Sequence, residues 1–316
     1  MKNRLLKLIL GGLAVFGTVV SAETTASGQQ NCNIPDCCAN TDADHIKVRF
    51  LGTGAADWNG KDERGEHRRW SSILVDDKVL VDFTPSDEDM LPDGFRAETI
   101  LYTHSHGDHY NPEAALKIGV KKVYCGDSWA ERCKSDFAKT AARLGVDAPE
   151  ITALKQQEEV TVDGVTFKAL PANHCTGDLQ EQALIYLMIK GDCRVLYATD
   201  TGGIPANAAR GGQFGVDGLD RKFWKPLNGL IMEATMGLGE VENFRIFSHS
   251  CVDDVLHTYN VLKKTHCYKP ADGVPVYLTH LARTLHGTQA ELDSMLPAPL
   301  KAAYDGLEVI FYGVNQ

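Results

Sequence analysis

One short segment of the chain holds four side chains of the kinds that bind metal ions. Residues 102–110 place three imidazoles and one carboxylate in the pattern H-x-H-x-D-H, with no thiolate among them. The four residues are His104, His106, Asp108 and His109. Imidazole and carboxylate suit zinc, and they also suit manganese and iron. A polar loop with chance histidines is the alternative, but the whole chain has only 11 histidines, so this spacing indicates a metal site.

The flanking sequence indicates which elements position this segment. The apolar run 99–101 reads as a strand end, so the motif is expected on the turn that follows it. Beyond the motif, strands are expected to alternate with helices. The expected strands are 47–54, 71–76, 79–84, 274–278 and 307–312, and the expected helices are 127–144, 252–263 and 288–296.

Two hairpins are expected at 159–170 and 183–199, turning at Asp163-Gly164 and at Lys190-Gly191-Asp192. The apolar stripe of helix 127–144 has helical spacing, which is typical of a helix packed on a core. No tandem repeat or low-complexity linker divides residues 46–316. This part of the chain is therefore expected to be one domain of the α/β or α+β class.

Five further segments, each at or near an expected strand end, carry glycine, histidine or aspartate. They are Gly52-Thr53-Gly54, Val79-Leu80-Val81-Asp82, Asn173-His174, Ala198-Thr199-Asp200-Thr201 and Leu278-Thr279-His280. With the H-x-H-x-D-H motif, their order and spacing resemble the characteristic motifs of the metallo-β-lactamase fold superfamily. The resemblance covers residues 47–314 and implies an α+β fold, a four-layer αββα sandwich.

Within that superfamily the chain most resembles the phosphoribosyl cyclic phosphodiesterase (PhnP-like) branch. The runs that carry this resemblance are 199–205, the Leu-Thr-His end at 278–280, and 303–309. That branch often has a structural zinc site built from cysteines in the loop after the first strand. Loop 55–70 has no cysteine, so this structural zinc site is not expected here.

The resemblance implies two divalent metal ions, zinc first and manganese as the alternative. It assigns His104, His106 and His174 to the first metal and Asp108, His109 and His280 to the second, with Asp200 bridging both. Taken alone, His174 and Asp200 could be ordinary loop residues, but both follow strands in the order that the superfamily requires. His280 competes with His249 and His286 for the last position, and it is preferred because it ends an apolar strand.

Two metals about 3.5–4 Å apart can share a hydroxide and clamp the attacking and leaving oxygens, so no side-chain nucleophile is needed. His249 and Asp108 are the expected catalytic residues, and His249 would donate a proton to the leaving alkoxide. A surface histidine near a helix start is the alternative for His249. Asp82 is expected to orient a ligand.

The loop 55–70 borders the mouth of the site by resemblance. Arg68 and Arg69 are its candidate substrate-binding residues, because their forked donors could grip a phosphate. A solvated charged loop is the equal alternative.

Three functions remain open from the sequence. A dinuclear phosphodiesterase is favoured, and a lactone, lactam or thioester hydrolase is the alternative, because the same hydroxide can attack a carbonyl. A non-catalytic metal scaffold is disfavoured because all seven expected ligands are present. The bridging Asp200 argues against a true β-lactamase, and His106 stands where an oxygen-reducing di-iron protein would have an acid.

Residues 1–22 have the pattern of a secretory signal. Three cations precede the apolar run 8–20, and Val20-Ser21-Ala22 reads as a cleavage site. Removal of those cations changes the formal charge from −10 to −13. We therefore expect an exported protein, periplasmic or secreted, with no membrane span after cleavage. We expect a small anionic substrate and no general nucleic-acid binding, which needs a basic face. The sequence does not specify an oligomeric state.

Nine cysteines remain after cleavage, and export permits disulfides. The odd number leaves at least one thiol unpaired or paired between chains. Three of them, Cys32, Cys37 and Cys38, fall in the segment 23–45, which is expected to be flexible. Cys193 and Cys251 are expected to be buried free thiols.

Overall fold

The computed structural model describes residues 44–210 and 225–314, which form two mixed β-sheets of seven strands each. The predicted signal segment and all but the last two residues of 23–45 lie outside the described residues. The strands of the first sheet are β1 (His45–Gly52), β2 (Ser72–Val75), β3 (Val79–Val81), β4 (Thr99–Leu101), β5 (Lys122–Gly126), β6 (Glu150–Leu154) and β14 (Glu308–Tyr312). Their order in the sheet is β14-β1-β2-β3-β4-β5-β6.

The second sheet has the order of a hairpin meander followed by parallel strands. Its members are β7 (Glu159–Val162), β8 (Val165–Pro171), β9 (Leu184–Lys190), β10 (Cys193–Ala198), β11 (Gly229–Glu233), β12 (Val276–Thr279) and β13 (Leu300–Ala302). They lie in the order β13-β12-β11-β10-β9-β8-β7. Strands β7 to β10 pair antiparallel, and β10 to β13 pair parallel.

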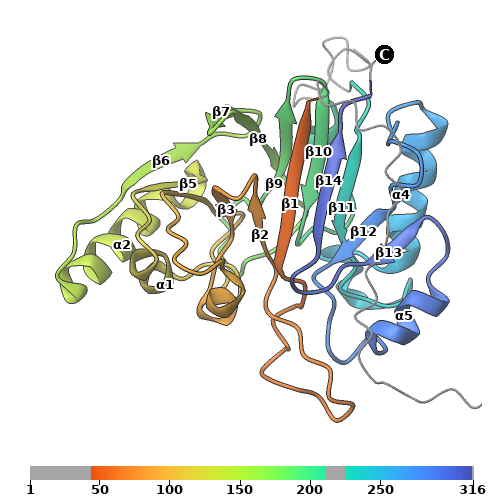
Figure 1. The fold of residues 1–316 in the computed structure, drawn as a ribbon, viewed down its shortest axis with the longest axis horizontal. Coiled ribbons are helices and arrows are strands. Elements are labelled where there is room, and N and C mark those ends of the chain that lie inside the picture. Colours follow the sequence, from red (N-terminus) through yellow and green to blue (C-terminus); the bar gives the residue numbers. More distant parts are fainter. Residues whose placement is uncertain (1–43, 211–224, 315–316) are drawn as a thin grey trace, which may run out of the picture. The chain divides into compact units, whose positions relative to one another are not determined.

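Helices lie against both sheets (Figure 1). The α-helices are α1 (Pro112–Lys117), α2 (Ala130–Leu144), α3 (Ala206–Arg210), α4 (Val252–Lys264) and α5 (Gln289–Met295). Three short 3-10 helices are η1 (Pro85–Met90), η2 (Asp127–Trp129) and η3 (Phe244–Phe247). None of the helices within the described residues combines the length and apolar character needed to cross a membrane.

Three apolar cores hold these layers together. One lies between the sheets and contains Phe50 of the first sheet and Phe167 of the second. A second joins the outer face of the first sheet to α1 and α2, where Phe137 is fully buried. A third joins the outer face of the second sheet to α4 and α5 through Val255 and Leu292. Helix, sheet, sheet and helix layers follow one another, which confirms the predicted αββα sandwich.

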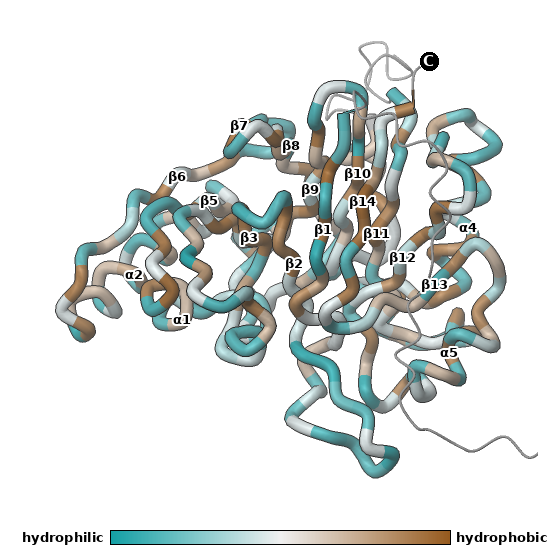
Figure 2. The backbone as a smooth tube through the Cα atoms, viewed as in Figure 1, coloured by the Kyte–Doolittle hydropathy of each residue, from teal (hydrophilic) through white to brown (hydrophobic). Residues whose placement is uncertain are grey.

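The long connection between β1 and β2 is mainly hydrophilic, and it projects from the sheets (Figures 1 and 2). It contains loop 55–70, and its start at Thr53 and Gly54 is nevertheless buried. The backbone N–H of Gly54 donates to the carbonyl oxygen of Arg69 over 2.7 Å, so the two ends of the loop are joined. The loop is therefore anchored at its base.

All cysteines of the described residues are free thiols. Cys193 and Cys251 are buried, as predicted, whereas Cys175 is exposed. Cys32, Cys37 and Cys38 lie outside the described residues.

Candidate metal centre

The carboxyl ends of parallel strands bring the predicted ligands together. Strands β3, β4 and β5 are parallel in the first sheet, and β10, β11 and β12 are parallel in the second. Asp82 directly follows β3. Asp200 follows β10 after one intervening residue, Thr199, and His280 directly follows β12. All three have positive φ values, of 58°, 46° and 54° respectively. Residues held in this left-handed region cluster at functional sites, and aspartate and histidine tolerate it better than most.

Two groups of predicted ligands form two adjacent clusters. Within each cluster the ligand atoms lie within 4.8 Å of one another. The first cluster contains His104, His106 and His174, and the Nδ1 atom of His106 is 3.1 Å from the Nε2 atom of His174. The second cluster contains Asp108, His109 and His280.

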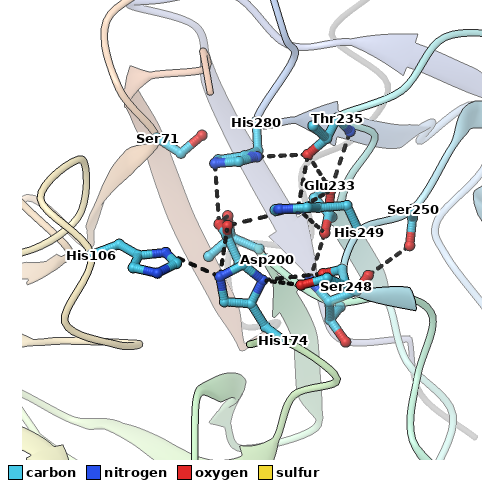
Figure 3. Close-up of polar contacts among 12 residues, drawn as sticks. Ser71, His106, His174, Asp200, Glu233, Thr235, Ser248, His249, Ser250 and His280 are labelled. Atoms are coloured by element: carbon cyan, nitrogen blue, oxygen red, sulfur yellow. Dashed lines mark hydrogen bonds and ion pairs between the residues drawn. The ribbon is translucent and has the colours of Figure 1, made fainter. Parts of the chain in front are cut away.

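Asp200 lies between the two clusters and faces both (Figure 3). Its Oδ2 atom is 3.0 Å from Nε2 of His109 and 3.3 Å from Nε2 of His280. Its Oδ1 atom is 3.7 Å from Nε2 of His174. One carboxylate therefore presents one oxygen to each histidine cluster, which is the arrangement that a bridging ligand requires.

The hydrogen bonding of the histidines fits metal ligation. The Nε2 atoms of His104, His109 and His280 are buried and make no well-aligned hydrogen bond within the described residues, although those of His109 and His280 face the Asp200 carboxylate. Their Nδ1 atoms are partnered, at 3.0 Å by the hydroxyl of Thr103, at 2.9 Å by Asp82, and at 2.7 Å by the hydroxyl of Thr235. Metal-ligating histidines typically bind through one nitrogen while the other donates to such a partner.

The protonation equilibria also fit a site that takes up cations. Burial and the neighbouring His109 hold the pKa of His104 well below its usual range, so this imidazole is neutral. Burial opposes ionisation of Asp200, but the facing histidines, His280 first, hold its pKa well below the usual range. Burial lowers the pKa of His109, yet Asp200 and Asp108 raise it well above the usual value. A proton on His109 thus balances the carboxylates, and a metal cation would displace it.

Asp82 supports both clusters. Its carboxylate accepts from Nδ1–H of His109 and, at 2.7 Å, from the hydroxyl of Thr103. The same hydroxyl is 3.0 Å from Nδ1 of His104. The carboxylate also accepts from the backbone N–H of Thr103 at 2.8 Å. As expected from the sequence, Asp82 contacts a ligand; the relay to His104 was not anticipated.

His249 lies beside the clusters, as predicted, and a buried acid holds it in place. The Oε1 atom of Glu233 accepts from Nδ1–H of His249 at 3.1 Å. Burial lowers the pKa of His249, but the Glu233 carboxylate outweighs it and raises this pKa to about 9. The rings of His249 and His280 are nearly parallel, with centroids 5.5 Å apart. His249 also groups with His174 and Asp200 as a set of ligand atoms, so its position is compatible with donating a proton and with binding a metal.

Sequence reasoning missed Glu233 and Thr235. Glu233 is fully buried at the end of β11, where it also accepts from the backbone N–H of Thr201 at 2.5 Å. The hydroxyl of Thr235 lies against Glu233 and against Nδ1 of His280. An acid that ends an apolar run, as in Gly229–Glu233, is the signal that could have identified this residue.

A second missed acid fixes the turn that carries the H-x-H pair. The buried carboxylate of Glu181 accepts from the backbone N–H of Ser105 at 2.8 Å and from its hydroxyl at 2.7 Å. Arg132 at the start of α2 binds both Glu181 and Ser105. Glu181 and Arg132 thus hold Ser105, and with it the turn between His104 and His106, in place.

The structure gives Arg68 and Arg69 contacts within the protein. Arg68 is only 5% exposed, and its guanidinium donates to the Thr53 hydroxyl at 2.8 Å and to the Ala303 carbonyl oxygen at 2.7 Å. Arg69 forms a two-pronged ion pair with Asp89. The predicted phosphate contact of these arginines stays a prediction.

Comparisons with known proteins agree with this geometry. The family model described as the beta-lactamase superfamily domain matches residues 80–265, more than half of the chain. No curated protein matches the chain significantly.

Three solved structures illustrate the likeness of fold. A diphosphatase from the PhnP family is 21% identical with a TM-score of 0.57, and the match covers 85% of this chain and 98% of that one. The short form of human tRNase Z is 15% identical with a TM-score of 0.57, covering 83% and 98%. Zn(2+)-bound PqqB from Methylobacterium extorquens is 14% identical with a TM-score of 0.59, covering 83% and 99%. The family match, the αββα layers and the clustered histidines lead to one conclusion: this chain belongs to the β-lactamase superfamily and is a metal-dependent hydrolase of the metallo-β-lactamase fold.

Proposed function

We propose that the protein is a dinuclear metal-dependent phosphodiesterase. The observation that carries the proposal is the position of Asp200, whose two carboxylate oxygens face two separate clusters of ligand atoms. Zinc is the proposed metal, with manganese as the alternative. The first ion would be held by His104, His106 and His174, and the second by Asp108, His109 and His280.

Bound divalent ions supply Lewis acidity and a water of lowered pKa, which removes the need for a side-chain nucleophile. The protein supplies a rigid frame around them. The ligand imidazoles and the buried carboxylate of Asp200 are positioned before any ion binds, because Asp82 and Thr235 hold the far nitrogens of His109 and His280. Such preorganisation stabilises developing negative charge at little cost in reorganisation.

His249 is the proposed proton donor to the leaving oxygen. The buried Glu233 accepts from Nδ1–H of His249, so the ring is oriented and its protonated form is favoured. A leaving alkoxide needs such a proton, whereas a leaving thiolate does not, so this pair supports cleavage of an oxygen ester.

The names of two structural relatives support phosphate chemistry. One is a diphosphatase and another a tRNase, although both share only the fold with this chain at their level of identity. The zinc named in PqqB supports the choice of metal in the same limited way. We also propose export of the mature chain, based on the sequence of residues 1–22 alone.

The test compares substrate classes on protein reconstituted with zinc or with manganese. Metals per chain are counted by elemental analysis, and turnover is measured for an activated phosphodiester, a phosphomonoester, a lactone and a β-lactam. We expect about two metals per chain and the fastest turnover with the phosphodiester. Faster turnover of the lactone would favour a carbonyl hydrolase over a phosphodiesterase. A single metal per chain at saturation would refute the bridging role of Asp200.

A further inference from the structure

The turn that leads to His249 exposes aromatic and cationic groups. In η3 the side chains of Phe244 and Phe247 are 74% and 81% exposed. Arg245 comes between them in the sequence, and its guanidinium lies 5.0 Å from the centroid of the Phe244 ring. It makes no ion pair with any residue of 44–210 or 225–314. An apolar ring beside an unpaired cation is a feature that binding sites use.

The same turn is fixed against the metal centre. The carbonyl oxygen of Arg245 accepts from the backbone N–H groups of Ser248 and His249, at 2.8 and 2.7 Å. The carbonyl oxygen of Ser248 is in turn 3.1 Å from Nδ1 of the ligand His174 (Figure 3). The exposed groups therefore belong to a structured rim, not to a free loop.

Gly202, two residues after Asp200, shows how close this contact is. A Cβ atom at Gly202 would lie only 2.6 Å from the carbonyl oxygen of Ile246. Only glycine lets η3 approach the backbone beside Asp200 this closely. The rim thus rests directly on the loop that presents Asp200 to both clusters.

Distance along the chain places the exposed ring within reach of a bound substrate. Phe247 is two residues before His249, so their Cα atoms are at most about 7 Å apart. A group attached to the reacting phosphate extends over a similar distance. The carbonyl oxygen of Arg245 accepts from the backbone N–H of His249, so the backbone that carries this cation is held next to His249.

We infer that Phe247 and Arg245 recognise a phosphodiester that carries a planar aromatic or heterocyclic group. Phe247 stacks on the ring, and Arg245 pairs with the phosphate charge. The chain carries a net charge of −10, so an arginine whose backbone contacts His249, and which has no ion pair among the described residues, would favour an anion there. Arg68 and Arg69 already have protein partners, so they are poorly placed to provide this contact. The inference rests on the proposed function and specifies its substrate.

The experiment uses two phosphodiesters with the same leaving group. Bis(p-nitrophenyl) phosphate retains an aryl group after cleavage, whereas methyl p-nitrophenyl phosphate retains a methyl group. The full chain, reconstituted with metal, should favour the aryl ester. Phe247→Ala should lower the aryl-to-methyl ratio of kcat/KM roughly tenfold, within the range measured for loss of stacking. Phe247→Trp should preserve the ratio.

Arg245→Ala separates charge from stacking. It should raise KM for both esters by a similar factor, because both carry the same phosphate charge. Tyr312→Ala is the matched control: Tyr312 is an exposed aromatic that pairs with His45, at the end of β1 remote from Gly52 and the site. This control should change neither KM nor the ratio. Calorimetric binding of a non-hydrolysable phenylphosphonate ester gives a second measurement, independent of turnover.

Three outcomes overturn the inference in distinguishable ways. If the wild type cleaves neither diester, the proposed phosphodiesterase fails and the inference fails with it. If both are cleaved and Phe247→Ala leaves the ratio unchanged, the proposed function stands and the ring site is wrong. If Phe247→Ala alters only the oligomeric state measured by size-exclusion chromatography, the exposed ring belongs to an interface with a second copy of the chain.

Discussion

Replacement of Asp82 by Asn should weaken metal binding although Asp82 is not itself a ligand. Asp82 accepts from Nδ1–H of His109 at 2.9 Å and from the hydroxyl of Thr103, which supports His104. Asparagine keeps the shape, tolerates the φ of 58° and can still accept from the backbone N–H of Thr103. Its amide N–H₂ group, however, would face the ring N–H of His109, so a charge-assisted hydrogen bond becomes a contact between two donors.

The magnitude follows from the bond that is lost. A hydrogen bond to a charged group contributes about 1.5–3 kcal/mol, and about 1.4 kcal/mol corresponds to a tenfold change in affinity. The second cluster should therefore bind zinc roughly 10- to 100-fold more weakly, which is also typical for loss of such an orienting partner. The first cluster should weaken less, because its contact with Asp82 runs through Thr103. Competition titrations with a zinc-chelating dye resolve the two affinities.

Two further variants make this test specific. Asp76→Asn is the matched control. Asp76 lies on the turn between β2 and β3, also has a positive φ, of 49°, and accepts from the backbone N–H of Lys47 in β1. This control should leave both zinc affinities unchanged. Thr103→Val removes only the relay and should weaken the first cluster alone. The reasoning is refuted if Asp82→Asn folds, as judged by circular dichroism, and binds both zinc ions with wild-type affinity.

Four other outcomes are expected. Asp200→Ala should abolish activity and lower metal content below two per chain; full occupancy with normal turnover would disprove the bridge. His249→Ala should retain both metals while kcat falls by about 10²–10⁴; loss of a metal would make His249 a ligand. Arg68→Ala should lower the free energy of unfolding in urea by about 2–4 kcal/mol, because buried acceptors lose a charged donor; a change under about 0.5 kcal/mol, typical of surface sites, would contradict the buried role. Burial, opposed by hydrogen bonds from Thr84, raises the pKa of Asp87 to about 7, so the folded state keeps a proton that the unfolded chain loses near pH 4. The stability that this proton contributes is full below pH 4 and is lost as the pH rises through 7. Asp87→Asn should therefore reduce the drop in urea midpoint between pH 5 and pH 8. An equal drop in the wild type and in the variant would contradict this expectation.

The first metal motif was readable from the sequence because its ligands are neighbours in the chain. The hairpins at 159–170 and 183–199 were also readable, because each combines alternating apolar residues with a turn sequence containing glycine. Asp200 and His280 could be predicted because each stands just beyond a buried apolar strand. In each case local sequence carries the information.

Several short strands were not assigned from the sequence, for the opposite reason. Strands β5, β6, β11 and β13 have three to five residues, and each is a strand because it pairs with a partner far along the chain. For β13, that pairing with β12 is the whole cause, since three residues carry no periodicity. Propensity cannot supply information that lies in tertiary pairing.

The side-chain partners show the same limit more sharply. Two adjacent arginines in a loop have the same sequence whether they bind a phosphate or the protein. The acceptor of Arg68 at Ala303 lies 235 residues away, and Asp89, which binds Arg69, lies 20 residues away. Glu233 orients His249, which lies 16 residues further along the chain, and no sequence pattern links the two positions. Whether a charge is free is thus a property of the fold, and sequence alone could not decide it.

This difference explains why the chemistry of the site is better determined than its substrate. Strand pairing fixes Asp82, Asp200 and His280, because each lies just beyond a buried strand and each adopts the left-handed backbone that turns the chain at that point. Substrate selection instead depends on loops such as the turn before His249. The positions of the exposed side chains on that turn are not set by strand pairing. A change at the exposed Phe247 should leave the ligand side chains in place, while a change at Asp82 should disturb both clusters. The two classes of variant should therefore separate cleanly, the first in the preference between substrates and the second in metal affinity.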